Sequence, residues 1–219
     1  MNRLALFDCD GTLVDSQHSI CAAMEACFAE AGLEQPARER TRSVVGLSLV
    51  EAMQRMLPGA EPGTHAALAE AYKRAFQGLR GQGLVEEPLF DGVAELIEAL
   101  EAQGWLLGIA TGKSHRGLTL CLDAHGLAGR FVTLQTADLH PSKPHPSMIE
   151  VAMAEAGAAP ATTLMIGDTS YDMAMARAAG ATAVGVAWGY HDAEELIRAG
   201  ADHIATRPTD IIALTRSFA

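Results

Sequence analysis

Short apolar segments alternate with helical segments along most of this chain, and the alternation restricts its fold more than any other feature. The clearest apolar segments are RLALFD at 3–8, WLLGIAT at 105–111, TTLMIGD at 162–168 and ATAVGVAWG at 181–189, with weaker ones at 130–135 and 202–206. Their near-continuous apolar character is typical of strands covered by helices on both faces. The pattern predicts an α/β fold, a doubly wound parallel sheet with a Rossmann-like core.

The helical segments share a stop signal. A glycine stands at the end of each, at Gly104, Gly126, Gly157, Gly180 and Gly200, and the next strand follows within a few residues. Glycine can take the left-handed conformation that closes a last helical turn without a Cβ penalty. The five stops therefore support the alternation.

Residues 16–81 interrupt this alternation. The segments SICAAMEACFAEAG, LSLVEAMQRML and GTHAALAEAYKRAFQGLR are all helical in pattern, with no convincing strand between them. We interpret them as an all-α helical cap, inserted into a core made of residues 1–15 and 82–219. Gly81 and Gly83 mark the second boundary as an expected hinge.

Charge and composition exclude several kinds of partner. The formal net charge is −11 and no block of Lys or Arg stands out, so we expect neither nucleic acid nor an anionic membrane as a partner. No apolar run approaches the ~18 residues that span a bilayer, and the first residues lack a secretory signal. The four cysteines show no metal-binding spacing and are interpreted as reduced thiols. These features predict a cytoplasmic protein, a monomer or a homodimer.

Charged and polar residues collect where the predicted strands end. In chain order they are Asp8, Asp10, Thr111, Gly112, Lys113, Asp168 and Asp172, and Lys143 joins them from the loop leading to the next helix. Ligands of open α/β sheets bind outside the carboxyl ends of the strands, so these side chains are expected to converge. Two like charges 4 Å apart repel by about 4 kcal/mol at an effective dielectric of 20. The carboxylates therefore need a cation, and their oxygen atoms suit Mg²⁺.

The same carboxylates suggest a reaction. A carboxylate can attack a phosphoryl group and form an aspartyl-phosphate, which splits one difficult step into two easier ones. A second carboxyl two residues along, across a tight Gly turn, can protonate the departing alkoxide.

The motifs DCDGTLVDS, IATGK, SKP and GDTSYD resemble, in order, the four motifs of the haloacid-dehalogenase-like phosphohydrolases. The resemblance covers essentially the whole chain, and the helical insert is similar to the small α-helical cap of the phosphoglycolate-phosphatase-like branch. It implies that Asp8 is the nucleophile and Asp10 the general acid/base. It further implies that the phosphoryl group is bound by Thr111, the Gly112 backbone and Lys143. The Mg²⁺ ligands would be Asp8, the Asp10 carbonyl and Asp168, and Asp172 would support the site.

Three cap residues are weaker candidates. The segment RSVVGLSL at 42–49 is interpreted as a loop entering a cap helix, and such loops face the substrate in relatives. We therefore include Arg42, Gly46 and Ser48 as substrate-binding candidates. Asp15 is expected to cap a helix or to hold its loop, and Lys113 to be a surface lysine after the turn.

The expected activity is Mg²⁺-dependent hydrolysis of a small phosphate monoester, phosphoglycolate-like, through an aspartyl-phosphate. The acid at Asp10 disfavours the dehalogenating and phosphonate-cleaving members of the superfamily, which lack it. The similar sugar-phosphate mutases carry a histidine where Ile20 stands. An inorganic pyrophosphatase, a nucleotidase and a sugar-phosphate mutase stay open as alternatives.

Functions from other classes fit less well. GIATGKSH places three residues between its glycines where a nucleotide-binding P-loop needs four. Receiver domains share the acidic cluster with Thr and Lys, but they are much shorter and have no helical insert. A non-catalytic relative would not need the complete motif set.

Overall fold

The computed structural model describes residues 1–216 and residue 218. Its strands form one parallel sheet in the order β3-β2-β1-β4-β5-β6. They are β1 (Asn2–Phe7), β2 (Leu106–Thr111), β3 (Thr133–Thr136), β4 (Ala158–Gly167), β5 (Thr182–Val186) and β6 (His203–Ala205). All six predicted strands are present, and the doubly wound α/β fold is confirmed.

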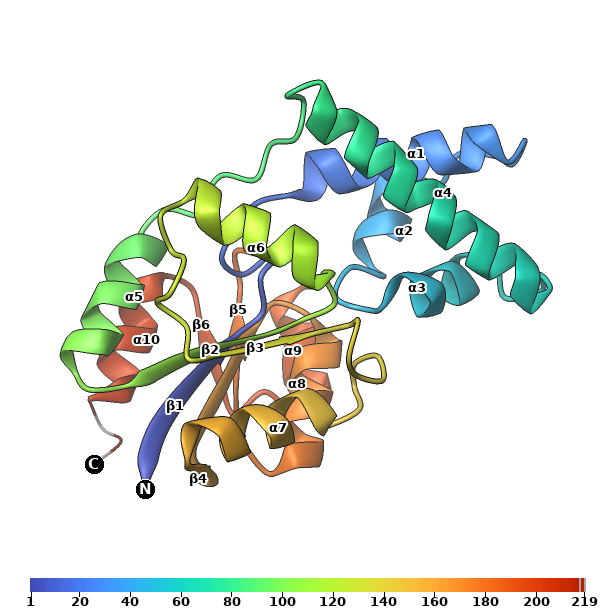
Figure 1. Cartoon of the computed structure of the whole chain (residues 1–219). Helices are drawn as coiled ribbons and strands as arrows, with labels where there is room; N and C mark the ends of the chain where they lie inside the picture. The colour runs from blue at the N-terminus through green and yellow to red at the C-terminus, as the bar shows by residue number, and fades with distance from the viewer. Residues whose placement is uncertain (217, 219) are drawn as a thin grey trace.

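Helices cover both faces of this sheet (Figure 1). One face packs against α5 (Val93–Ala102), α6 (His115–Ala124) and α10 (Pro208–Thr215). The other packs against α7 (Ser147–Ala156), α8 (Ser170–Ala179) and α9 (Ala193–Arg198). The glycines at all five predicted helix stops have positive φ angles, from 62° to 104°, as the stop signal requires.

The central strand β1 shows why these segments are apolar throughout. Its side chains alternate between the two faces, so that Ala5 and Phe7 join one apolar cluster and Leu4 and Leu6 join the other. All four are fully buried. A strand in this position has no face left for polar residues, except at its end.

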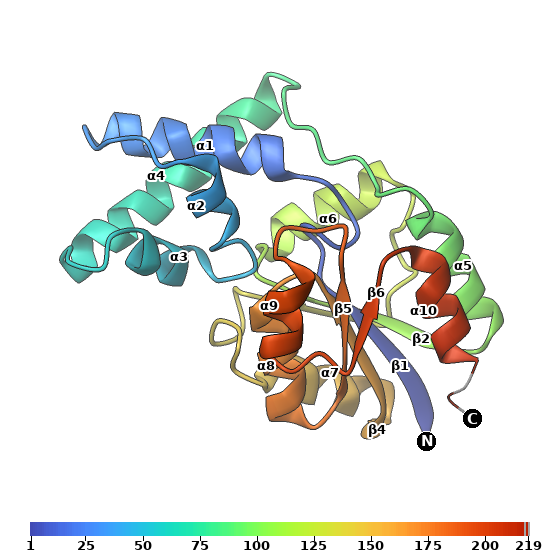
Figure 2. The same cartoon turned by 180° about the vertical axis from the view of Figure 1, so that it is seen from behind.

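The helical insert folds as α1 (Gln17–Glu30), α2 (Arg38–Arg42), α3 (Leu49–Met56) and α4 (Pro62–Gly81). These helices bury an apolar cluster of their own, which includes Met24, Phe28, Met53 and Leu68. Helix α2 was not predicted, because RERTR contains no apolar residue and so has no hydrophobic periodicity. The insert lies beyond the carboxyl ends of the strands, and the N-terminus and the end of α10 lie at the opposite end of the molecule (Figures 1 and 2).

The insert contacts the core directly. The backbone N–H of Ser48 donates to Ser142 Oγ at 2.9 Å, and the Tyr171 hydroxyl donates to the carbonyl of Ser43 at 2.8 Å. A Cβ on Gly112 would lie 2.5 Å from the carbonyl oxygen of Gly46. The loop between α2 and α3 is therefore held against the strand ends, and Gly112 has no room for a side chain.

The helices and the cysteines bear on two further expectations, concerning membrane spans and free thiols. No helix in the described part of the chain is long and apolar enough to cross a membrane. The four cysteines are free thiols and all are buried.

Candidate active site

Three buried carboxylates meet where the strand order of the sheet reverses. Asp8 directly follows β1, Asp168 directly follows the neighbouring strand β4, and Asp172 lies in the first turn of α8. One carboxylate oxygen of each lies within 4.8 Å of the others, and none of the three residues is exposed. This switch point is where open α/β sheets bind ligands.

Lys143 is the buried cation of this cluster. Its ammonium donates to Asp172 Oδ1 at 2.7 Å and forms an ion pair with Asp8 Oδ2 at 2.9 Å. Burial alone would lower the pKa of Lys143, but Asp172 and Asp8 outweigh it and raise that pKa. The lysine therefore stays charged and balances part of the negative charge.

One lysine does not balance three carboxylates. Burial raises the pKa of Asp8 to about 6, against the attraction of Lys143. Burial, together with the charges of Asp8 and Asp172, raises the pKa of Asp168 well above its usual range. The contact of Asp8 Oδ2 with Lys143 lacks hydrogen-bond geometry, and this buried oxygen has no hydrogen-bond partner among the described residues. The site is thus short of positive charge.

The donor set fits a hard divalent cation. The carbonyl oxygen of Asp10 accepts no hydrogen bond from any residue the structure describes. Asp168 is held rigidly, since its oxygens accept from Thr12 Oγ1 at 2.8 Å and from the Tyr190 N–H at 2.9 Å. A Cβ on Gly11 would lie 2.2 Å from Asp168 Oδ2, so only glycine fits there. Rigid carboxylate and carbonyl oxygens of this kind suit Mg²⁺.

The raised pKa of Asp8 predicts how stability depends on pH without metal. The carboxyl titrates near 3.8 in the unfolded chain and near 6 in the folded one, so the folded state binds more protons between these values. With EDTA present, the urea midpoint should therefore fall as pH rises from about 4 to about 6. This fall should be smaller in Asp8→Asn. An equal fall in that variant would contradict the prediction.

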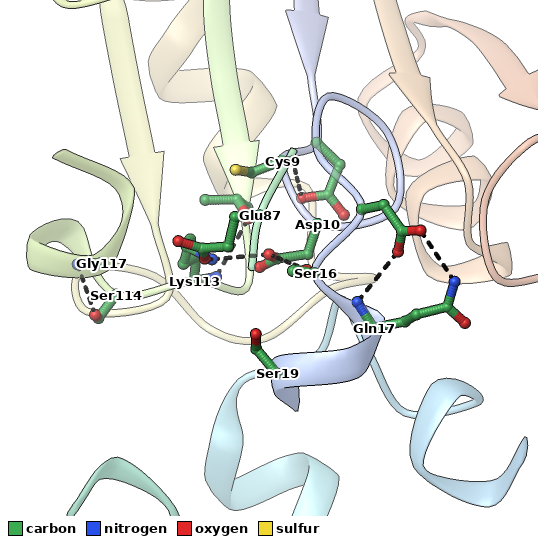
Figure 3. A network of polar contacts seen from close by, with 12 residues as sticks. Cys9, Asp10, Ser16, Gln17, Ser19, Glu87, Lys113, Ser114 and Gly117 are labelled. Carbon is green, nitrogen blue, oxygen red and sulfur yellow. Dashed lines mark hydrogen bonds and ion pairs between the residues drawn. The ribbon is translucent and has the colours of Figure 1, made fainter. Parts of the chain in front are cut away.

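A second polar network surrounds Asp10 (Figure 3). Asp10 Oδ1 accepts from Ser16 Oγ at 2.6 Å and from Lys113 Nζ at 2.7 Å, and Lys113 also donates to Glu87 Oε1 at 2.7 Å. Burial opposes the charge on Lys113, but the attraction of Asp10, Cys9 and Glu87 outweighs it and raises the pKa of the lysine. The prediction that Lys113 is a surface lysine was wrong, because its side chain is only 9% exposed and is paired with both Asp10 and Glu87.

Ser16 and Glu87 belong to the two linkers that join the helical insert to the core. These linkers run side by side, since the Asp15 N–H donates to the carbonyl of Pro88 at 2.8 Å. The carboxylate of Asp15 accepts from the backbone N–H of Gln17 at 3.3 Å, at the start of α1. This is the loop-holding role expected of Asp15. The position of Asp10 is therefore coupled to both connections of the insert.

A cavity of about 480 Å³ opens between the insert and the core at this point. Asp8, Asp10, Thr111 and Gly112 line its core side. Lys143 does not line the cavity but reaches this group through its ion pair with Asp8. Of the three cap candidates, Gly46 lines this cavity.

The other two cap candidates lie elsewhere. Arg42 lines a separate cavity of about 310 Å³ and donates to Gln17 Oε1 at 3.1 Å. Ser48 holds its loop through its bond to Ser142. The substrate contacts predicted for Arg42 and Ser48 stay predictions that this arrangement does not support.

The sequence of the chain matches the family model of the haloacid dehalogenase-like hydrolases over residues 5–186. The chain belongs to this family. It is 37% identical to the probable phosphatase IndB of Dickeya dadantii, over 90% of this chain and 86% of that protein. It is 32% identical to a phosphoglycolate phosphatase of Xanthomonas campestris, over 86% of this chain and 84% of that protein. The crystal structure of a hydrolase from Pseudomonas syringae superposes over the full length of both chains, with a TM-score of 0.87 and 28% identity.

These relatives confirm the predicted family and make the protein an enzyme of the phosphatase class. Several residues of the hydrolase site were nevertheless not predicted from the sequence. Thr12 and the Tyr190 backbone orient Asp168, and Thr169 donates to Asp172 Oδ2 through its backbone N–H and its hydroxyl at 3.1 and 2.7 Å. The Thr169 contacts form a capping box at the start of α8. The T-x-x-D spacing could have revealed this pair, whereas nothing local in the sequence marks Tyr190.

Proposed function

We propose that the protein is a Mg²⁺-dependent phosphatase that transfers the phosphoryl group of a small phosphate monoester to Asp8 and then to water. The observation that carries the proposal is the cluster of three buried carboxylates with a single buried lysine at the edge of a cavity. The phosphatase names of IndB and of the Xanthomonas relative support it, and the latter makes phosphoglycolate one candidate substrate.

In the first step a carboxylate oxygen of Asp8 attacks phosphorus, and the bond from phosphorus to the leaving oxygen breaks. Asp10 gives its proton to that oxygen as the alcohol departs. In the second step water attacks phosphorus, Asp10 takes a proton from the water, and the bond between Asp8 and phosphorus breaks. Inorganic phosphate leaves and both carboxyl groups return to their starting states.

The remaining residues hold charge and position. Thr111, the Gly112 backbone and Lys143 would bind the oxygens of the phosphoryl group. Asp8, the Asp10 carbonyl and Asp168 would hold Mg²⁺, and Asp172 would support the set through its bond to Lys143. A bound Mg²⁺ supplies positive charge for the transferring phosphoryl oxygens.

We also propose a cytoplasmic enzyme that acts on a small phosphorylated metabolite as a monomer or a homodimer, with neither nucleic acid nor membrane as partner. Four free buried cysteines and the net charge of −11 support this setting.

The direct test is phosphate release at neutral pH, with Mg²⁺ or with EDTA, from phosphoglycolate, pyrophosphate, nucleoside monophosphates and hexose phosphates. We expect release from some of these compounds, and only when Mg²⁺ is present. Release that EDTA leaves unchanged would contradict the metal dependence. No release from any compound would contradict the proposed function.

Asp168→Ala should weaken Mg²⁺ binding by at least about tenfold, because one rigidly oriented carboxylate is removed from the ligand set. Calorimetric titration of Mg²⁺ into the protein measures this without substrate. Asp202→Ala, which removes a partly exposed carboxylate far from the cluster, is the control. Equal affinity in wild type and Asp168→Ala would remove Asp168 from the ligand set.

Lys113→Met should lower kcat by about tenfold or more for an alkyl phosphate, because the ammonium that holds Asp10 is lost. The loss should be smaller for 4-nitrophenyl phosphate, whose leaving group needs no proton. Lys113→Arg should recover part of the rate. An equal loss for both substrates would mean that Lys113 does not act through Asp10.

A further inference from the structure

We propose that the substrate is a phosphate monoester whose leaving group carries a flat aromatic or heteroaromatic ring, which the cavity between insert and core encloses. This inference rests on the proposed function and names the substrate class of that site. Phosphoglycolate and pyrophosphate should then be poor substrates of this enzyme, because their leaving groups are small and negatively charged.

The wall of the cavity beyond the catalytic residues is mainly apolar. Ile20 and Met24 of α1 contribute to it, as do Val44, Val45 and Leu47 of the loop between α2 and α3. The volume of about 480 Å³ lies within the ~300–1,000 Å³ typical of sites that enclose drug-sized ligands. Glycolate, with only a few atoms and a carboxylate at its end, would leave most of this apolar surface exposed to water.

Helix α4 adds an aromatic surface to the same wall. Tyr72 and Phe76 lie one turn apart, with ring centroids 6.0 Å apart and planes inclined by 32°. Aromatic faces favour ring-bearing ligands, through offset or edge contacts worth more than the buried area alone. An alkyl or anionic group gains less from such a surface.

The cations around the cavity are largely committed to partners of their own. Lys113 is paired with Asp10 and Glu87, and Arg80 is paired with Glu87. Lys73 is paired with Glu70 in an exposed contact. Arg116 has no ion pair among the described residues, but its side chain is exposed at the start of α6. The apolar wall therefore offers no enclosed, unpaired cation for the carboxylate of glycolate or the second phosphate of pyrophosphate.

One hydroxyl group among the residues of this wall lacks a partner. Thr41 is 1% exposed, and its Oγ1 has no hydrogen-bond partner in the described part of the chain. Buried hydroxyls are normally paired, so an unpaired one in a residue that lines the cavity is available to a polar atom of a ligand. A ring with a polar atom at its edge would satisfy it.

The test compares esters whose leaving groups are all alkoxides, so that only the body of the leaving group differs. We would measure kcat/KM of the wild-type enzyme with Mg²⁺ for benzyl phosphate, a nucleoside 5′-monophosphate, ethyl phosphate and phosphoglycolate. At least one ring-bearing ester should exceed both small esters by about tenfold or more, since a buried ring removes a large apolar area from water. Phosphoglycolate above both ring-bearing esters would overturn the inference and leave the proposed function standing. No turnover of any ester would instead contradict the proposed function.

Two variants locate the ring. The Phe76 ring also lies against the ammonium of Lys113, 5.9 Å from the ring centroid. Phe76→Ala should therefore lower kcat/KM about tenfold more for the preferred ring-bearing ester than for ethyl phosphate. Leu79→Ala, on the same helix, is the control for a loss of helix packing. Equal losses for both esters in Phe76→Ala would overturn the placement of the ring on α4.

Tyr72→Phe tests whether the ring of the leaving group is aromatic, as in benzyl phosphate, or heteroaromatic, as in a nucleotide. A loss confined to the nucleotide would place the hydroxyl against a heteroaromatic edge. Binding to the catalytically inactive Asp8→Asn protein, measured by calorimetry, gives the same comparison without chemistry. Weaker binding of both ring-bearing esters than of ethyl phosphate would overturn the inference.

Discussion

Asp8→Asn should abolish phosphate release while leaving the fold intact. The amide is a far weaker nucleophile than the carboxylate, so we expect kcat to fall by at least about 10³-fold. The substitution also removes one of three buried negative charges within 4.8 Å of one another, so thermal stability in EDTA should be unchanged or higher. Both quantities come from one purified protein, by a phosphate assay and a melting curve.

The matched control is Asp15→Asn, in the same loop. Asp15 holds the start of α1 and does not belong to the carboxylate cluster, so its variant should keep kcat within a few-fold of wild type. Turnover by Asp8→Asn at a rate close to that of wild type would contradict the assignment of the nucleophile. A large loss of stability in Asp8→Asn would contradict the electrostatic account of the cluster.

Lys143→Met should lower both stability and activity. Lys143 is 1% exposed and pairs with Asp8 and Asp172, so its removal leaves buried carboxylates without their cation. Breaking a buried pair from one side costs about 3–5 kcal/mol. For a chain of this size that corresponds to a fall in melting temperature on the order of 10 °C.

The control for Lys143→Met is Arg74→Met, which breaks the exposed pair between Arg74 and Glu30. Both side chains are more than half exposed, at 60% and 56%, so the cost should be below about 1 kcal/mol. The double variant Lys143→Met with Asp8→Asn should recover part of the stability, because it removes one of the unpaired charges. An equal effect of Asp8→Asn on stability in the wild-type and Lys143→Met backgrounds would mean that Lys143 and Asp8 are not coupled.

The effect of Lys143→Met should depend on pH. Without the lysine, the buried carboxylates are destabilising when charged, so the stability difference from wild type should shrink as they are protonated in acid. The comparison is made by urea unfolding in EDTA at about pH 5 and about pH 8. A difference that grows in acid would contradict this sign.

Much of the fold follows from local patterns in the sequence. The four clearest strands contain short apolar runs, whereas β3 (TLQT) and β6 (HIA) give weaker signals. Each of the five predicted helix stops is a glycine with positive φ. Both signals lie within a few residues of the sequence. An apolar run indicates a strand buried on both faces, and a glycine indicates the backbone conformation at a helix end. Helix α2 escaped prediction because its residues RERTR are polar and too few to show a period.

The candidate site was predictable in part, for a different reason. Residues at the carboxyl ends of parallel strands must meet, so Asp8 and Asp168 could be brought together from topology alone. Lys113 could not be assigned, because its burial depends on Glu87, which lies 26 residues earlier in a linker of irregular structure. The separation of Arg42 from the main cavity likewise depends on the packing of an unpredicted helix.

The most direct test of the central claim, an aspartyl-phosphate at Asp8, uses Asp10→Asn with 4-nitrophenyl phosphate and Mg²⁺. The leaving group needs no proton, so the first step proceeds, while the second step slows without its base and the intermediate accumulates. Borohydride reduces an aspartyl-phosphate to homoserine, which peptide mass spectrometry locates. The account predicts a burst of nitrophenolate equal to the enzyme present, with homoserine at position 8. A burst with the modification at another residue, or no burst, would contradict it.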